Sequence, residues 1–299
     1  DYASQSADML YSLLSNVDMR IRQKAQFELV SRGAKGAPML TKAIDQTQSQ
    51  LARIHGIWGV GQLARVNKAN ASTLLPLLKD KDPEIITQAA KMLGDARIAT
   101  AGSELIPLLK NTSPRVRFYA AEALGRIAYA DAVTPLIEMI AANNDEDVYI
   151  RHAGVLALSR IGKAEPMVAL ANNPSKALRT AAVLVLRRMK NDNIALFLND
   201  KDEYIVAEAA RGINDDLSIP GALPALAAKL QDKSITSDVI LRRAINAALR
   251  VGTDKELDML VAFATRTDIK DDVKAEALAT LGTWANPSVL DRVDGRYRG

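Results

Sequence analysis

Apolar residues recur along the chain with the spacing of an α-helix, and one small residue marks each copy of the pattern. The small residue returns about every 31 positions, at Ala25, Gly56, Ala89, Ala120, Gly154, Ala182, Ala209, Ala244 and Ala277. An apolar residue stands four positions before it and another four positions after it, so the three side chains line one stripe of a helix. A small residue in the middle lets a neighbouring helix approach closely. The pattern predicts nine helices, each of which buries such a stripe.

Polar residues mark where these helices begin. Eight of the nine repeats have Asp or Ser seven positions before the small residue, namely Asp18, Ser49, Asp82, Ser113, Asp147, Ser175, Asp202 and Ser237; the ninth has Lys270. Asp and Ser side chains accept hydrogen bonds from the unpaired amides of a first helical turn. Gly33, Gly162 and Gly252 follow the small residue by eight positions and suit left-handed helix ends.

A shorter segment with an internal proline precedes several of these helices. Its prolines, which we expect near a helix start or at a kink, are Pro38, Pro76, Pro107, Pro135 and Pro224. Two helices per repeat, a capping Asp or Ser and a proline in the first helix resemble the HEAT repeat. The resemblance implies an all-α, right-handed HEAT-repeat superhelix (an α-solenoid) of about nine helix pairs, with the second helices on its concave side. We expect the solenoid over residues 1–284 and a C-terminal connector tail over residues 285–299.

Composition limits the chemistry that the chain can perform. The 299 residues include no cysteine, which excludes disulfides, thiolate zinc sites, cysteine nucleophiles and covalent haem attachment within this sequence. No run of 18 apolar residues predicts a membrane span. The chain opens at Asp1 without an initiator Met, so we expect a fragment or a processed product. We therefore expect no cofactor and no metal in this chain, and its cellular location stays open.

Few residues are candidates for catalysis. His55 and His152 are the only histidines and lie about three repeats apart, so we expect both to pack or hydrogen-bond within their helices. The sequence has no glycine-rich phosphate loop and no Gly-x-Ser-x-Gly or His-Glu-x-x-His motif. Trp58 is expected to pack in the core, in the gap left by Gly56 and Gly59. We predict no catalytic residue.

A basic residue stands three positions before the small residue in six repeats. The predicted ladder consists of Asp18, Arg22, Arg53, Asp82, Arg117, Asp147 and Arg151. Asp18–Arg22 and Asp147–Arg151 are spaced for i,i+4 ion pairs within one helix. We expect an Asp/Arg ladder that joins successive repeats; the rival hypothesis is a row of cations that binds phosphates.

A second basic cluster follows in the C-terminal half. It comprises Arg179, Arg187, Arg188, Lys190, Arg242, Arg243 and Arg250. These side chains would suit an acidic protein, a polyanion or a nucleic acid if they gathered into one interaction patch. The net charge of +4 is mild and aromatic residues make up only 4% of the chain, which disfavours nucleic acid. A solvated helix face is the favoured interpretation.

Three stretches carry a more specific resemblance: RIHGIWGVGQL, YIRHAGVLALSRIG and the C-terminal VLDRVDGRYRG. Together they resemble the HEAT-repeat region of bacterial membrane-bound-dehydrogenase-like proteins, also described as PVC-type haem-binding and sorbosone-dehydrogenase-like proteins. The resemblance implies a parent protein with a β-propeller before the solenoid, a c-type cytochrome module after it, and redox work outside the cytoplasm, in the periplasm or beyond. It assigns no catalytic residue to any position of this chain.

The leading hypothesis is a non-catalytic HEAT-repeat scaffold and protein-interaction domain, one module of such a parent, with protein as its partner. One alternative is a free-standing scaffold that binds an acidic protein or nucleic acid through the basic patch. Another is a HEAT-type lyase or glycosylase whose groove holds a ligand.

Overall fold

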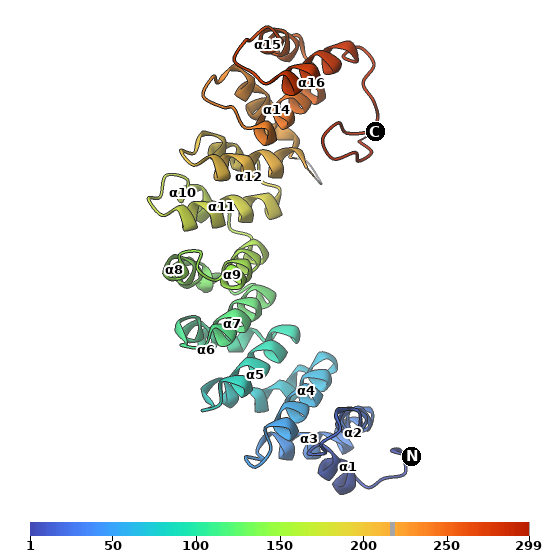
Figure 1. Ribbon diagram of the computed structural model, residues 1–299. Helices are drawn as coiled ribbons and strands as arrows, with labels where there is room; N and C mark the ends of the chain where they lie inside the picture. Colours follow the sequence, from blue (N-terminus) through green and yellow to red (C-terminus); the bar gives the residue numbers. More distant parts are fainter. Residues whose placement is uncertain (216–218, 299) are drawn as a thin grey trace. The chain divides into compact units, whose positions relative to one another are not determined.

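The computed structural model describes residues 1–215 and 219–298. Within them the chain is helical, and the extended structure is one isolated bridge between Leu290 and Tyr297. The backbone forms two compact units, unit 1 over Asp1–Ile161 and unit 2 over Gly162–Gly299 (Figure 1). The division between solenoid and tail at residue 284 stays a prediction.

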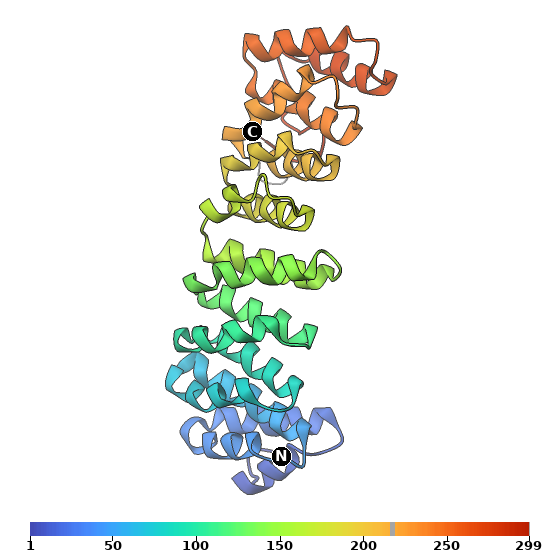
Figure 2. The same cartoon turned by 90° about the vertical axis from the view of Figure 1, so that its left-hand side faces the viewer.

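Unit 1 contains five helix pairs. In chain order they are α1 (Ala7–Leu13) with α2 (Met19–Ser31), α3 (Ala37–Ile44) with α4 (Gln50–Val66), η2 (Lys68–Lys79) with α5 (Pro83–Asp95), α6 (Gly102–Leu105) and η4 (Ile106–Lys110) with α7 (Pro114–Ile127), and α8 (Val133–Asn143) with α9 (Val148–Ile161), where η marks a 3₁₀-helix. Each second helix packs on the next, α2 on α4, α4 on α5, α5 on α7 and α7 on α9 (Figure 2).

Unit 2 contains four pairs. They are α10 (Glu165–Ala169) with α11 (Lys176–Met189), η6 (Asp192–Asn199) with α12 (Glu203–Asn214), α13 (Leu223–Ala227) and η8 (Ala228–Gln231) with α14 (Asp238–Val251), and α15 (Asp254–Ala264) with α16 (Asp271–Gly282). The second helices α11, α12, α14 and α16 again pack in chain order. The described residues thus form nine helix pairs, which confirms the predicted all-α repeat architecture.

The predicted N-caps explain why the second helices begin where they do. Seven of the eight Asp and Ser side chains accept a hydrogen bond from a first-turn amide. The Asp caps accept from the amide two residues on, as Asp82 does from Glu84, whereas the Ser caps accept from the amide three residues on, as Ser113 does from Val116. Ser237 stands at the start of α14, where its hydroxyl makes no such bond. The predicted glycines Gly33, Gly162 and Gly252 have φ of 54°, 79° and 69°.

The proline-containing first helices are less regular than the second ones. Pro38 and Pro224 lie in the first turns of α3 and α13, where the missing amide is not needed. Pro76 instead lies inside the 3₁₀-helix η2, and Pro107 lies at the point where α6 gives way to the 3₁₀-helix η4. A proline has no amide hydrogen to donate along a helix, and both of these prolines lie in 3₁₀-helices rather than in α-helices.

The small residues of the repeat are all buried, and at Gly56 the closeness of the neighbouring helix can be measured. A Cβ atom there would come within 2.7 Å of the carbonyl oxygen of Leu40, and at Gly59 it would meet the Leu40 side chain. The gap left by these two glycines is therefore filled by α3. The prediction that the Trp58 ring fills it is wrong, and Trp58 is half-buried at the surface of α4.

None of the helices in the described parts of the chain combines the length and the apolar character that crossing a membrane requires.

Candidate functional site

The arginines of the predicted ladder hold the turns between helices. Nη1 of Arg22 donates to the carbonyls of Asn16 and Val17 at 2.6 and 3.0 Å, and Nη1 of Arg117 donates to the carbonyl of Asn111 at 2.8 Å. Arg53 donates from Nε to the carbonyl of Ile44 at 2.7 Å. Each guanidinium thus satisfies backbone acceptors in the turn that leads into its own helix.

Two members of the ion pairs predicted within single helices pair with other residues. Asp18 pairs with Arg20 at 2.6 Å, and Arg151 pairs with Asp145 at 3.2 Å. Asp18, Asp82 and Asp147 instead cap their helices, because a cap side chain folds over the first turn and away from the residue four positions on. Hydrogen bonds from the side chain and backbone of Arg20 lower the pKa of Asp18 to about 2.

Two arginines do link successive repeats, through aspartates that the sequence analysis missed. Arg53 on α4 pairs with Asp80 before α5 at 2.6 Å, and Arg179 on α11 pairs with Asp200 before α12 at 2.7 Å. A sequence signal for these partners exists, because Asp or Asn stands two residues before most caps: Asn16, Asp80, Asn111, Asp145, Asn173 and Asp200. In five of these six positions the side chain accepts from the amide of the cap residue, for example Asp200 from Asp202 at 2.8 Å, whereas the amide of Asp147 donates to Asn143.

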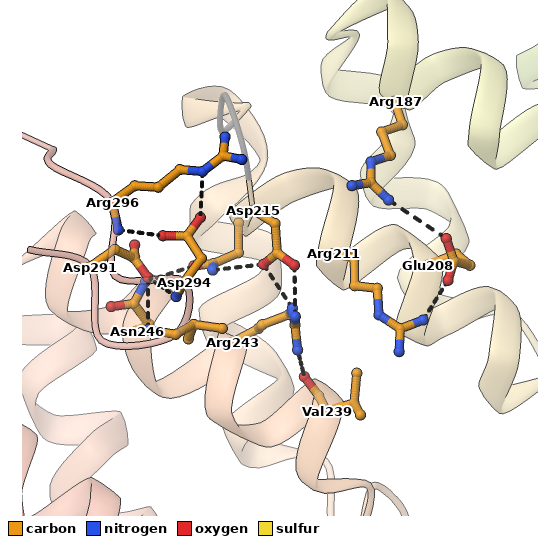
Figure 3. A network of polar contacts seen from close by, with 12 residues as sticks. Arg187, Glu208, Arg211, Asp215, Val239, Arg243, Asn246, Asp291, Asp294 and Arg296 are labelled. Carbon is orange, nitrogen blue, oxygen red and sulfur yellow. Dashed lines mark hydrogen bonds and ion pairs between the residues drawn. The ribbon is translucent and has the colours of Figure 1, made fainter.

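Carboxylates accompany most arginines of the predicted basic patch, all of which lie in unit 2; Figure 3 shows two of them, Arg187 and Arg243. The guanidinium of Arg243 pairs with Asp215 at 2.6 Å, that of Arg242 with Asp272 at 2.7 Å, and that of Arg187 lies 3.7 Å from Glu208. Arg179 is buried against Asp200. Because these four charges are neutralised locally, they do not form a bare positive surface.

The remaining members of the predicted patch are Arg188, Lys190 and Arg250. Arg188 and Lys190 are exposed at the end of α11, where Lys190 adopts a left-handed conformation with φ of 52°. Arg250 is half-buried on α14 near Arg298, and burial together with the charge of Arg298 lowers its pKa. Arg188 and Lys190 thus remain as two exposed cations at the end of α11. This agrees with a solvated helix face, the interpretation favoured in the sequence analysis.

His55 lies in a buried polar row on the second helices of unit 1. Its Nε2 accepts from Nε of Arg22 at 3.1 Å, and its Nδ1 lies 2.7 Å from Oε1 of Gln26, so Nδ1 carries the proton and donates. Gln26 in turn donates to Gln62 at 3.1 Å. Burial and the charge of Arg22 lower the pKa of His55 to about 4. His55 is therefore a neutral bridge between repeats, whereas His152 is exposed on α9.

A second row of contacts positions Trp58 at the surface. Trp58 stacks edge-on against His55 with ring centres 5.1 Å apart, and its Nε1 donates to Gln88 at 2.7 Å. Gln88 donates to Glu84, which also pairs with Arg115 at 2.8 Å. Burial alone would raise the pKa of Glu84, but the hydrogen bonds from Arg115 and Gln88 outweigh it and lower that pKa. The indole is thus fixed across three repeats.

An open groove of about 410 Å³ runs over these side chains, across α2, α4, α5 and α7. Phe27, Trp58 and Tyr119 supply its aromatic surface, and Gln23 and Gln62 supply amide groups. Its cations are already engaged: Lys91 and Arg65 lie 3.0 and 3.6 Å from Asp95, and Arg115 pairs with Glu84. The groove therefore offers aromatic faces and amides with little net charge.

No cluster of three or more His, Asp or Glu side chains that could hold a metal ion occurs within residues 1–215 and 219–298.

The neutral state of His55 predicts a pH dependence of stability. In the unfolded chain the imidazole regains its ordinary pKa of 6.5, so acidification from there towards about 4 protonates the unfolded state first. The contribution of neutral His55 to the free energy of unfolding is fully present above about pH 6.5. Below that pH it falls by about 1.4 kcal/mol per pH unit, until His55 is protonated in the folded state as well. Urea unfolding of the His55→Gln variant, followed from about pH 7 to about pH 4, should show a shallower loss than the unsubstituted chain. His152→Gln is the matched control and should keep the full slope; equal slopes for both variants would contradict the assignment.

Comparisons with known proteins agree with this architecture. Residues 71–159 match the family model of HEAT repeats. A chain in the structure of Kap95p with RanGDP is similar over 93% of this chain and 45% of its own length, at 12% identity and a TM-score of 0.54. The fold is an all-α HEAT-repeat solenoid, the class of repeat found in many scaffold and protein-interaction domains.

Other solved structures are more distant in shape. A chain of the CpcE–CpcF phycocyanin lyase complex from Nostoc is 20% identical, with 87% of this chain and 95% of that chain covered and a TM-score of 0.43. Human deoxyhypusine hydroxylase is 16% identical, with 95% and 98% covered and a TM-score of 0.34. A search of the curated proteins finds no match to this sequence.

Proposed function

We propose that this chain is a non-catalytic HEAT-repeat scaffold that docks an extended segment of a protein partner in the groove of unit 1. The observation that carries the proposal is the groove itself, because it spans four second helices and presents Phe27, Trp58 and Tyr119 in one row. Aromatic side chains dominate the energetics of protein interfaces, and side-chain amides pair with the backbone of an extended peptide.

The electrostatics of the groove favour a polypeptide over a polyanion. The Arg65, Lys91 and Arg115 side chains that border it each lie within ion-pair distance of a carboxylate of unit 1. A phosphate backbone would have to displace these carboxylates, whereas a neutral peptide would not. No observation favours the alternative of an acidic or nucleic-acid partner on the basic patch, and none favours a lyase or glycosylase.

A selection from a phage-displayed library of random peptides tests this proposal. Trp58 reports on the groove directly once Trp284 is replaced by Phe, because the chain has no third tryptophan. Selected peptides should change the Trp58 fluorescence, and Phe27→Ala should weaken them about tenfold or more, since it removes a 48% exposed ring without opening the core. Tyr204→Ala, which truncates an exposed aromatic residue of unit 2, is the matched control. Selected peptides that bind the Phe27→Ala variant with unchanged affinity would refute the groove as the docking site.

We further propose that the chain is one module of a larger membrane-bound-dehydrogenase-like protein that works outside the cytoplasm and holds c-type haem beyond these residues. The support is the resemblance of three stretches, which form part of α4, α9 and the C-terminal segment. Sequencing the reading frame on both sides tests it: a propeller before the solenoid and a Cys-x-x-Cys-His motif after it are expected. A frame with neither would exclude this parent.

A further inference from the structure

The C-terminal segment, residues 285–298, folds into a small hairpin in unit 2. The amide of Asp291 donates to the carbonyl of Arg296 at 2.8 Å, and the amide of Arg298 donates to the carbonyl of Val289 at 2.9 Å. The amide of Gly295 closes the turn on the carbonyl of Asp291 at 2.9 Å, with φ of 71° at this glycine. The hairpin lies against α12 and α14 (Figure 3).

One buried carboxylate anchors this hairpin. The side chain of Asp291 is 0% exposed; it accepts from Nδ2 of Asn246 at 2.9 Å and from Nε of Arg298 at 3.3 Å. It also accepts from the amides of Val293 and Asp294 at 2.8 and 3.2 Å. Burial alone would raise the pKa of Asp291, but these hydrogen bonds outweigh it and lower that pKa. The hydrogen bonds of this site therefore stabilise the charged form of Asp291.

The receiving site belongs to the helices and holds together through its own bonds. Asn246 on α14 donates to the side chain of Asn214 at the end of α12 at 2.7 Å, and both are buried. Asn214 donates to Asp215 at 3.1 Å, and Asp215 pairs with Arg243. We call the pair Asn214 and Asn246 the asparagine socket. The bond from Asn246 to Asn214 orients these two amides without using any atom of the hairpin.

The hairpin leaves three of its large apolar side chains in solvent, whereas Val293 is half-buried. Val289 and Leu290 are 51% and 52% exposed, and Tyr297 is 73% exposed. A segment that belonged to the core would bury such residues, because their burial is the main source of folding energy. This segment is held instead by the Asp291 anchor, by Arg298 on the carbonyl of Asn214 at 3.0 Å and by the pair of Arg292 with Glu276.

We propose that the asparagine socket is a binding site for an Asp-containing hairpin, and that residues 285–298 are its exchangeable occupant. The competing occupant is the same segment of a second copy of this chain. Its Asp291 can accept from Asn246 and its Arg298 can donate to Asn214, as the tethered segment does. In one copy the tethered segment is present at an effective concentration of about millimolar, so it competes strongly with a segment supplied from elsewhere.

A fluorescein-labelled peptide of residues 285–298 tests the exchange by fluorescence anisotropy. Asp291→Asn in the full chain removes the charge of the tethered hairpin and vacates the socket, so this variant should bind the peptide about tenfold or more tightly than the unsubstituted chain does. The same peptide carrying Asp291→Asn should bind neither chain. Asp271→Asn, at an exposed carboxylate of α16, is the matched control and should behave as the unsubstituted chain. Equal binding to all three chains, or binding to none, would overturn the proposal.

Hydrogen exchange on the unsubstituted chain gives an answer even if the Asp291→Asn variant fails to fold. The amides of Asp291, Gly295 and Arg298, all hydrogen-bonded in the hairpin, should exchange at least about tenfold faster than those of the buried turns of α14. Exchange of both sets at one common rate would show that the hairpin opens only when unit 2 unfolds, and would refute an exchangeable occupant.

Discussion

Replacing Arg179 by methionine is expected to lower the free energy of unfolding of unit 2 by about 3–5 kcal/mol. The side chains of Arg179 and Asp200 are only 4% and 1% exposed, so the substitution leaves a carboxylate buried without its counter-charge. Methionine reproduces the apolar stem of arginine without the guanidinium, which limits the packing loss. The expected effect therefore reports the charge and its hydrogen bonds.

Backbone groups add to this cost. Nη1 of Arg179 donates to the carbonyls of Asn173 and Pro174 at 2.8 and 3.2 Å, and methionine has no donor for either. Each buried acceptor left without a partner costs about 1–3 kcal/mol. The substitution thus loosens both the turn before α11 and the link from α11 to α12.

Denaturation followed by Trp284 fluorescence in a Trp58→Phe background measures unit 2, because each unit contains one tryptophan. Arg242→Met is the matched control: its pair with Asp272 is 37% and 59% exposed, and exposed pairs contribute at most about 1 kcal/mol. An equal loss in the two variants would show that the buried pair has no special weight.

Replacing Gly94 by alanine is expected to destabilise unit 1 by about 1–3 kcal/mol. A Cβ at Gly94 would lie 2.6 Å from the Cα of Ala123, so α5 and α7 would have to move apart. The clashing atom belongs to the backbone and cannot rotate away. Alanine is intrinsically favoured over glycine in a helix by about 1 kcal/mol. A net loss of stability would therefore show that the clash outweighs this preference.

Gly282→Ala provides the control for this substitution. Gly282 ends α16, and a Cβ there would meet nothing within 4 Å, so alanine should leave stability unchanged or raise it by up to about 1 kcal/mol. Trp58 fluorescence in the Trp284→Phe background follows the Gly94 variant, and Trp284 fluorescence follows the control. A Gly94→Ala variant as stable as the unsubstituted chain would mean that the close contact of α5 with α7 is not a constraint.

The repeat could be predicted in some detail from the sequence. Asp82 and Ser113 cap the helices that they were expected to cap, and Gly252 ends its helix in the left-handed conformation. These features depend on backbone groups within about four residues, so the local sequence contains all the information they need. The spacing of the apolar stripe likewise requires only the geometry of one helix.

The candidate site was predicted only in part. The sequence indicated His55 and Trp58 as packing residues with no binding role, and it placed the Trp58 ring in the core. That error has a physical cause: which neighbour fills the gap at Gly56 depends on where α3 lies, and Leu40 reaches it first. The pairing of Gln88 with Trp58 across two repeats had no signal in the spacing of either residue.

Charge pairing shows what the sequence determines and what only the tertiary structure determines. The sequence by itself determined nine helix pairs with a buried stripe, eight of them with Asp or Ser at the cap position, because a helix is specified by interactions along one short segment. The tertiary structure decided that Arg53 meets Asp80 and that Asp291 enters the asparagine socket, because a long side chain selects its partner from whatever adjacent helices bring within reach. Local spacing places a charge on a helix face; only the packing of the next repeat says what neutralises it.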